Sequence, residues 1–215
     1  MSSIRWIKAN PDFCLTLWFP VYLLIYMIME EHIPVSGWAT QLPIDHFIPF
    51  CEWFLIPYSL WYPLLILLGV YLFGKDRPAF KRYMFFLAAT FFISEIIWFI
   101  IPNVQHLRPS NMPRDNALTS IISILYTVDT NTNVFPSVHV VGSLGAILAV
   151  WDSILKKHHP GICWFVTGLS ILICLSTVFI KQHSVLDVTA GGVLSLLVAV
   201  WIYGKLPCLL KGKDG

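Results

Sequence analysis

Six long apolar runs constrain this chain more than any other feature of its sequence. A transmembrane helix needs about 20 predominantly apolar residues, and these runs show no barrel-like alternation of apolar and polar residues. Only 12% of the residues are charged and the mean hydropathy is +0.71, whereas soluble domains carry about 25% charged residues. The sequence therefore predicts an all-α integral membrane protein, a six-transmembrane helix bundle that forms a single domain over residues 1–215. The predicted spans are roughly 13–30, 54–73, 82–101, 138–155, 162–180 and 186–204.

The distribution of lysine and arginine predicts the orientation of this bundle. If the N-terminus is cytoplasmic, eleven of the fourteen Lys and Arg residues fall on the cytoplasmic side. The positive-inside rule then favours a cytoplasmic location for both termini. The net charge of +2 and the lack of a basic stripe argue against a nucleic-acid partner. The eleven residues are Arg5, Lys8, Lys75, Arg77, Lys81, Arg82, Lys156, Lys157, Lys205, Lys211 and Lys213.

Three basic residues, Arg108, Arg114 and Lys181, are left in the loops on the outer side. These loops also hold the most polar motifs of the chain. Cationic side chains in such a place are candidate ligands for an anion. The alternative is that the three charges only solvate the loops.

The segment "KQHSVLD" places His183 four residues before Asp187, at the start of the last predicted span. On a helix this spacing brings both side chains to one face. A carboxylate that binds one imidazole nitrogen fixes the tautomer and leaves the other nitrogen as a nucleophile or base. The alternative is a structural pair that caps the helix.

The segment "NVFPSVHV" places His139 at the start of another predicted span on the same side. Pro136 and Ser137 suit a helix entry, with Ser137 as the N-cap. Helix N-termini bind phosphate well because their first N–H groups lack partners. Two histidines, an orienting acid and a cation are the groups that phosphoryl transfer requires.

These motifs resemble those of the type-2 phosphatidic acid phosphatase superfamily of lipid phosphatases and phosphotransferases. That family has the signatures Lys-x6-Arg-Pro, Pro-Ser-Gly-His and Ser-Arg-x5-His-x3-Asp. The chain has "IPNVQHLRP", "PSVH" and "STVFIKQHSVLD" in the same order, and the resemblance covers about residues 50–205. It implies that His183 forms a phosphohistidine, that Asp187 orients His183 and that His139 protonates the leaving alcohol. It further implies that Arg108, Ser137 and the backbone near Val138 hold the phosphate, without a metal or other cofactor.

Three positions depart from the family signatures. The expected lysine falls at Ile101, the glycine at Val138 and the arginine at Thr177. Lys181 lies four residues after Thr177, so on a continuous helix it would share the same face and replace the missing arginine. Arg114 is the candidate replacement for the missing lysine.

The resemblance implies a lipid phosphomonoester or diphosphate as substrate, membrane lipids as surroundings, and an extracytoplasmic active site in the plasma membrane. A looser resemblance to inositol phosphorylceramide and sphingomyelin synthases makes a lipid phosphotransferase with the same triad the alternative. Two further alternatives are a redox protein with histidine haem ligands and a non-catalytic lipid-binding member of the family. The positions of both histidines at span ends beside Arg and Lys suit an anion better than a haem.

Overall fold

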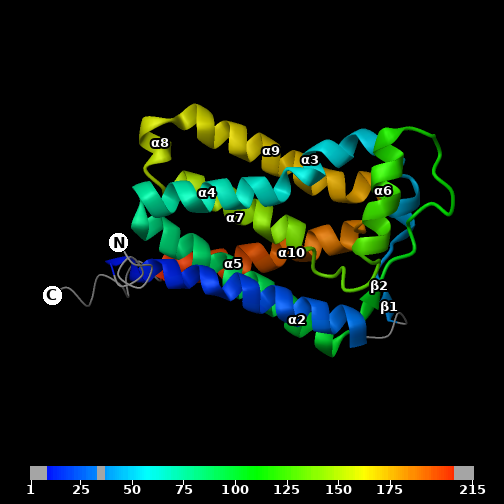
Figure 1. The fold of residues 1–215 in the computed structure, drawn as a ribbon, viewed down its shortest axis with the longest axis horizontal. Coiled ribbons are helices and arrows are strands. Elements are labelled where there is room, and N and C mark those ends of the chain that lie inside the picture. Colours follow the sequence, from blue (N-terminus) through cyan, green and yellow to red (C-terminus); the bar gives the residue numbers. More distant parts are fainter. Residues whose placement is uncertain (1–8, 33–36, 206–215) are drawn as a thin grey trace.

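The structure is a computed structural model, and it describes residues 9–32 and 37–205. Within these ranges, five helical segments are long and apolar enough to cross a membrane. They run roughly side by side (Figure 1). The segments are Pro11–Glu31, Glu52–Lys75, Arg77–Ile100, Pro160–Phe179 and Val185–Gly204. Their helices are η1 (Pro11–Leu17), α2 (Trp18–His32), η3 (Glu52–Phe54), α3 (Leu55–Ser59), α4 (Trp61–Lys75), α5 (Arg77–Ile100), α9 (Pro160–Phe179), α10 (Val185–Ala199) and the π-helical η4 (Val200–Lys205).

The remaining predicted span, at 138–155, is the shorter helix α7 (Val138–Asp152), which has 15 residues. It is the central helix of the bundle, because it packs against α4, α5, α9 and α10. Two glycines permit this close packing: a Cβ at Gly142 would lie 2.8 Å from the Trp61 ring, and one at Gly145 would lie 2.9 Å from Phe86. The N-terminal half of α7 is thereby held among these four helices.

One end of the bundle, which we call the α6 end, carries most of the irregular structure (Figure 1). Helix α6 (Ala117–Val128) lies across this end. Two short strands, β1 (Trp38–Ala39) and β2 (Asn103–Val104), pair in parallel below it. The short helix η2 (Pro43–His46) completes this end.

Asn103 holds the loop that leads to α7 in place. Its side-chain oxygen accepts hydrogen bonds from the backbone N–H groups of Val134 and Phe135, each at 2.8 Å. Its side-chain nitrogen donates to the carbonyl of Ile101 at 2.9 Å. Since Asn103 is buried, these bonds fix the path of residues 133–137 and with it the entry into α7.

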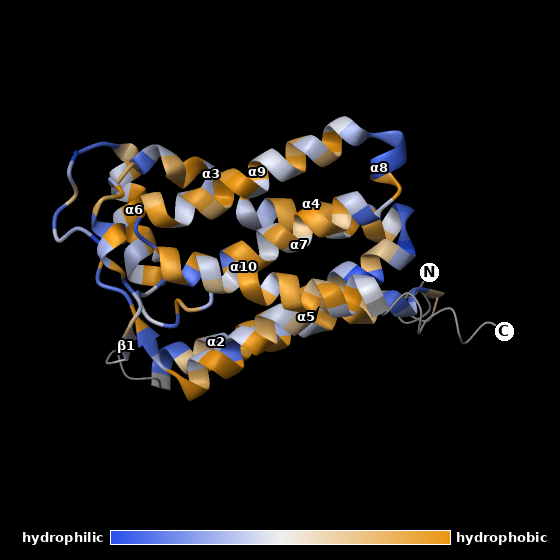
Figure 2. Ribbon diagram, turned by 180° about the vertical axis from the view of Figure 1, so that it is seen from behind, coloured by the Kyte–Doolittle hydropathy of each residue, from blue (hydrophilic) through white to orange (hydrophobic). Residues whose placement is uncertain are grey.

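The opposite end, which we call the α8 end, holds the short helix α8 (Leu155–His158) and the turn between α4 and α5 (Figure 1). Helix η1 begins and η4 ends at this end too. Figure 2 shows hydrophilic residues concentrated at the two ends and hydrophobic residues along the helices between them. The described cations predicted to be cytoplasmic include Lys81, which pairs with Asp12 at 3.0 Å, and Arg82, which pairs with Asp152 at 2.6 Å. Arg5, Lys8, Lys211 and Lys213 lie outside the described residues.

Candidate active site

A cavity of about 380 Å³ lies at the α6 end, between α2, α3, α4, α6 and the first turn of α7. We call it the histidine cavity, because His139 and His183 both line it. The sequence predicted that these two histidines act together, although 43 residues separate them along the chain. The structure brings them into one cavity.

The two imidazole rings meet edge to face through one nitrogen of each. His183 Nε2 lies 3.4 Å from His139 Nδ1, and the ring centroids are 5.5 Å apart. His183 Nδ1 lies 3.0 Å from the backbone oxygen of Val134, which can only accept a hydrogen bond. In a neutral imidazole the proton therefore sits on Nδ1, which leaves the Nε2 lone pair directed at His139. This is the geometry that a nucleophilic nitrogen requires.

Asp187 lies close to His183, but the expectation that the two share one helix face is wrong, because α10 begins at Val185 with Ser184 as its N-cap and His183 precedes it. Its Oδ2 atom is 3.7 Å from His183 Nδ1, close enough for an ion pair but beyond hydrogen-bond distance. The same oxygen accepts from the Ser184 N–H at 2.7 Å, and the Ser184 hydroxyl accepts from the Asp187 N–H at 3.2 Å. This is a capping box. Asp187 thus caps α10 and also supports the imidazole, so both interpretations of its sequence position apply.

Aromatic side chains of the Glu52–Lys75 segment fix the ring of His139. The ring of His139 stacks on Tyr58 with a centroid separation of 4.6 Å and contacts Trp61 at 4.3 Å. His139 is buried. Because Trp61 also packs on Gly142, one turn further along α7, the orientation of His139 depends on the packing of α4 against α7.

The start of α7 is tied to α10 through backbone atoms. The Ser137 N–H donates to the Asp187 carbonyl at 3.1 Å, and Gly191 leaves room for this approach, since a Cβ there would lie 2.9 Å from the Ser137 oxygen. Ser137 is the N-cap of α7, but its hydroxyl makes no capping bond. That hydroxyl is buried without a hydrogen-bond partner within residues 9–32 and 37–205. The Val138 side chain lines the histidine cavity.

Arg108 reaches the segment that borders the cavity. Its guanidinium donates to the carbonyls of Tyr126 at 3.0 Å, Asp129 at 2.7 Å and Thr130 at 2.6 Å, and to the side-chain oxygen of Gln182. It also lies over the Tyr126 ring, 4.4 Å from its centroid. Burial lowers the pKa of Arg108 from its ordinary value. Through these hydrogen bonds Arg108 fixes the backbone of residues 126–130, which borders the histidine cavity.

The structure directs the other two predicted cations elsewhere. The expectation that Lys181 continues the helical face of Thr177 is wrong, because α9 ends at Phe179 and Lys181 adopts a left-handed backbone with φ of 56°. The Lys181 ammonium donates to the carbonyls of Asp45 at 2.9 Å and Ile48 at 2.6 Å.

Arg114 is likewise engaged away from the histidines. Its guanidinium forms a two-pronged ion pair with Glu52, with Nε 2.7 Å from Oε1. Asn116 donates to the same carboxylate at 3.1 Å. Together these contacts tie the start of α6 to η3.

Asp129 is a cavity residue that the sequence interpretation missed. It ends α6 and lines the histidine cavity. Its carboxylate accepts from the hydroxyls of Tyr58 at 3.1 Å and Tyr26 at 3.4 Å, and from the Gln182 amide at 3.4 Å. Burial raises the pKa of Asp129 above its ordinary value, although His183, the Tyr58 hydrogen bond and Arg108 oppose that shift. None of the three family signatures includes position 129. Only the folded path of the loop shows that Asp129 lies in the cavity.

The described residues contain no group of three His, Cys, Asp or Glu side chains arranged to hold a metal ion. The groups around the two histidines are aromatic rings, aliphatic side chains, amides, backbone atoms and the two carboxylates of Asp129 and Asp187. The arrangement can supply a nucleophilic nitrogen, a neighbouring proton donor and helix-terminal amides.

The fold and the cavity define a class: a helical membrane protein with a paired-histidine site at one end of its bundle. A comparison with protein families identifies it further, since the model of the PAP2 superfamily matches residues 79–207. The chain belongs to the PAP2 superfamily, whose members are phosphoric-ester hydrolases or related transferases. Searches of curated proteins and of solved structures gave no match. The family predicted from the three motifs is therefore confirmed.

Proposed function

We propose that this protein is an integral-membrane lipid phosphatase that hydrolyses a lipid phosphomonoester or diphosphate through a phosphohistidine intermediate. The observation that carries the proposal is the position of His183 Nε2, 3.4 Å from His139 Nδ1, with its own Nδ1 held by the Val134 carbonyl. A nitrogen fixed in this tautomer beside a second titratable ring suits nucleophilic catalysis.

In the first step, His183 Nε2 attacks the phosphorus and forms the P–N bond. The P–O bond to the lipid breaks, and its electron pair leaves with the lipid oxygen. His139 gives that oxygen a proton, so a phosphomonoester releases its lipid as a neutral alcohol and a diphosphate releases it as a lipid phosphate. Asp187, 3.7 Å from His183 Nδ1, stabilises the positive charge that develops on the imidazole.

In the second step, water replaces the lipid. His139, now without its proton, removes a proton from the water as its oxygen attacks phosphorus. The P–N bond breaks, His183 regains its lone pair, and inorganic phosphate leaves. Each group returns to its starting state.

The phosphate oxygens are held by the first amides of α7 near Val138, by the Ser137 hydroxyl and by Arg108. The first N–H groups of a helix lack partners within it and favour an anion, and the Ser137 hydroxyl is buried without a partner in the described part of the chain. Arg108 reaches the phosphate by exchanging one of its carbonyl contacts. Lys181 and Arg114 stay hypotheses as phosphate ligands, since each has protein partners here.

The membrane placement is part of this proposal. Helix α7 crosses the membrane as the fourth of six spans, with the histidine cavity on the extracytoplasmic side of the plasma membrane and both termini in the cytoplasm. The cluster of cations at the α8 end supports this orientation. A reporter fused after Gly215 is expected to be cytoplasmic, and an external reporter would contradict the topology.

The test is phosphate release in detergent from phosphatidic acid, phosphatidylglycerophosphate and a polyprenyl diphosphate, with a chelator present. The purified wild type is expected to release phosphate, and His183→Ala is expected to release none. His158→Ala, which alters an exposed histidine at the α8 end, is the matched control and should behave as wild type. Release by His183→Ala at the wild-type rate would contradict the proposal.

A second candidate, a lipid phosphotransferase with the same three residues, is favoured by Asp129. A carboxylate in the histidine cavity repels a phosphomonoester dianion more than a phosphodiester, which carries one negative charge. With a phosphodiester donor, His183 takes the phosphoryl-alcohol group and a lipid hydroxyl replaces water in the second step. Transfer from a phospholipid to an alcohol acceptor, without phosphate release from any phosphomonoester, would select this candidate.

A further inference from the structure

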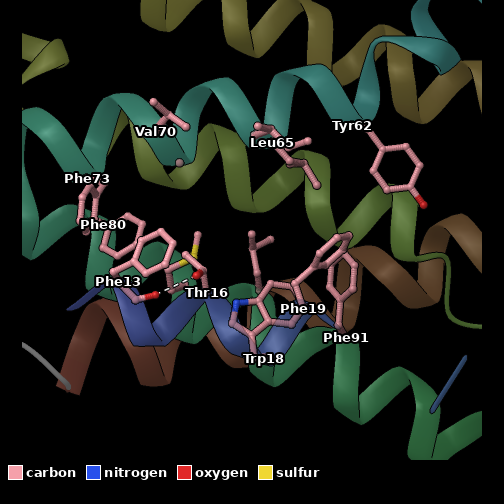
Figure 3. Close-up of a pocket in the computed structure, with 14 residues that line it drawn as sticks. Phe13, Thr16, Trp18, Phe19, Tyr62, Leu65, Val70, Phe73, Phe80 and Phe91 are labelled. Carbon is pink, nitrogen blue, oxygen red and sulfur yellow. Dashed lines mark hydrogen bonds between the residues drawn. The ribbon is translucent and has the colours of Figure 1, made fainter. Parts of the chain in front are cut away.

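A second cavity, of about 370 Å³, lies alongside the histidine cavity, between η1 and α2 on one side and α4 on the other, with α5 as its floor (Figure 3). We call it the apolar slot. Its walls are almost entirely aromatic and aliphatic, and none of its lining residues carries a charge. The Thr16 hydroxyl at its edge donates to the Phe13 carbonyl at 2.7 Å, so it is already satisfied. Such a surface suits hydrocarbon.

The apolar slot begins where the histidine cavity ends. Tyr62 lines both cavities, and Figure 3 shows its side chain at one end of the slot with Phe13 and Phe73 at the other. The residues that α4 presents to the slot recur every three or four positions from Tyr62 to Phe73, so they form one continuous face of the helix. A molecule in the slot therefore starts at the wall that the slot shares with the histidine cavity.

The length of the slot is limited. From Tyr62 to Phe73 the helix rises about 16 Å, which is roughly half of the 30 Å hydrocarbon thickness of a bilayer. At the far end, the rings of Phe13 and Phe73 meet at 5.9 Å and those of Phe73 and Phe80 at 5.1 Å, all edge to face. This aromatic cluster closes the slot at a depth that one leaflet-spanning acyl chain reaches.

We propose that the apolar slot holds one acyl chain of the lipid whose phosphate is bound in the histidine cavity, and that the cluster at its end limits the chain length accepted. The proposal rests on the proposed function, because it assigns the tail of the same substrate. The occupant is an acyl chain of one leaflet's length, since a polyprenyl chain would exceed the closed end.

Gly69 offers a way to fill the slot. It is buried on α4 between Tyr62 and Phe73 and lines the slot. A Cβ there would lie 3.8 Å from Met84 and 3.9 Å from Tyr83, which is ordinary contact, so Gly69→Ala fits without a shift. A leucine side chain would extend into the slot. Gly168→Leu is the matched control, because an added Cβ there meets nothing within 4 Å.

The first experiment compares hydrolysis of dipalmitoyl and dioctanoyl phosphatidic acid. We expect Gly69→Leu to lower kcat/KM for the dipalmitoyl lipid by about tenfold or more, and for the dioctanoyl lipid by less than about twofold. Gly69→Ala and Gly168→Leu should match the wild type on both. An equal loss on both lipids, or none on either, would overturn the proposal while leaving the phosphatase assignment intact.

A second experiment needs no turnover. A phosphatidic acid with a diazirine at the middle of its palmitoyl chain is irradiated with His183→Ala protein in vesicles, and the crosslinked peptides are identified. We expect crosslinks on α4 between Leu65 and Phe73 and on α5 near Met84, reduced at least fivefold by competing dipalmitoyl phosphatidic acid. Crosslinks that map to the outer faces of α9 and α10 instead, or that the competitor leaves unchanged, would overturn the proposal. Failure of the phosphatase assignment would appear in the phosphate-release assay and not in this one.

Discussion

The two cavities are nearly equal in size, about 380 Å³ and 370 Å³, but they are built in different ways. The histidine cavity depends on contacts between distant segments, such as His183 with the Val134 carbonyl and with His139. The apolar slot is lined by side chains of η1, α2, α4 and α5 alone. Polar groups with fixed hydrogen bonds surround the first, and apolar rings and methyl groups surround the second.

This difference teaches how one bundle separates two tasks. Chemistry needs a few polar groups held to a fraction of an ångström, and the loops at the α6 end supply them through backbone contacts. Binding a hydrocarbon needs only shape and the absence of unpaired polar atoms, which spanning helices supply without loops. Tyr62 is the residue at which the two meet.

The largest expected effect comes from removing a catalytic group of the histidine cavity. His139→Ala should lower kcat/KM for an alkyl phosphate ester by about 10²–10⁴-fold, because it removes the acid that protonates the leaving oxygen. With p-nitrophenyl phosphate the loss should stay below about tenfold, since that leaving group departs without a proton. Steady-state kinetics on both esters check this. Equal losses on the two esters would assign His139 to binding or structure instead.

The next effect concerns Lys181, whose ammonium holds the carbonyls of Asp45 and Ile48. Lys181→Ala should lower the free energy of unfolding by about 1.5–3 kcal/mol, the usual contribution of a hydrogen bond to a charged group. KM for the lipid phosphate should stay unchanged. Thermal unfolding in detergent and lipid titration measure the two quantities. A raised KM with unchanged stability would instead support Lys181 as the replacement for the missing family arginine.

A packing change should reach the histidine cavity without touching a catalytic group. A Cβ at Gly142 would lie 2.8 Å from the Trp61 ring, which contacts His139. Gly142→Ala should therefore cost about 1–3 kcal/mol of stability through overpacking and lower kcat more than it raises KM. Gly168→Ala, which adds a methyl group in open space, is the control. If both variants melt at the wild-type temperature, the close packing of α4 on α7 is not as described.

The smallest expected effect belongs to Asp129. Its pKa is raised by burial, against the opposing influence of His183, Tyr58 and Arg108, while the charge of Glu30 raises it further. Between its unfolded pKa of about 3.9 and the raised folded value, the folded state binds more protons than the unfolded state. Stability therefore falls as pH rises through that window.

Asp129→Asn should remove this slope and lower KM for a phosphomonoester by about two- to tenfold above that window, because a negative charge near the phosphate is gone. Melting temperature against pH and KM against pH are the measurements. A raised KM at every pH would show that the Asp129 carboxylate helps to bind the substrate.

The hydropathy of the chain predicts most of the bundle. A membrane-spanning helix is a long apolar run, which can be recognised from its own residues without knowing what it packs against. The motifs also predicted that His139, His183 and Asp187 lie near one another. The prediction was possible because each residue lies at the end of a predicted span on the same side of the bundle. The number of six spans stays a prediction, since α7 has only 15 residues. The orientation of the bundle in the membrane also stays a prediction.

The contacts that depend on the paths of the loops could not be predicted from the sequence. Asp129 lies outside every motif, and only its hydrogen bonds with Tyr58 and Gln182 show that it borders the cavity. Lys181 was misplaced because the end of α9 at Phe179 and the left-handed turn that follows reverse its direction. Nothing in the spacing of "STVFIKQHSVLD" marks that turn.

The most direct test of the account is to trap the phosphorylated enzyme. Wild-type protein is mixed with phosphatidic acid carrying labelled phosphate, quenched in base within milliseconds, and digested to locate the label. The account predicts a base-stable, acid-labile phosphoryl group on His183, which is absent from His183→Ala and accumulates in His139→Ala if water attack is slowed. Turnover without any label on His183, or label on another residue that supports the same rate, would contradict it.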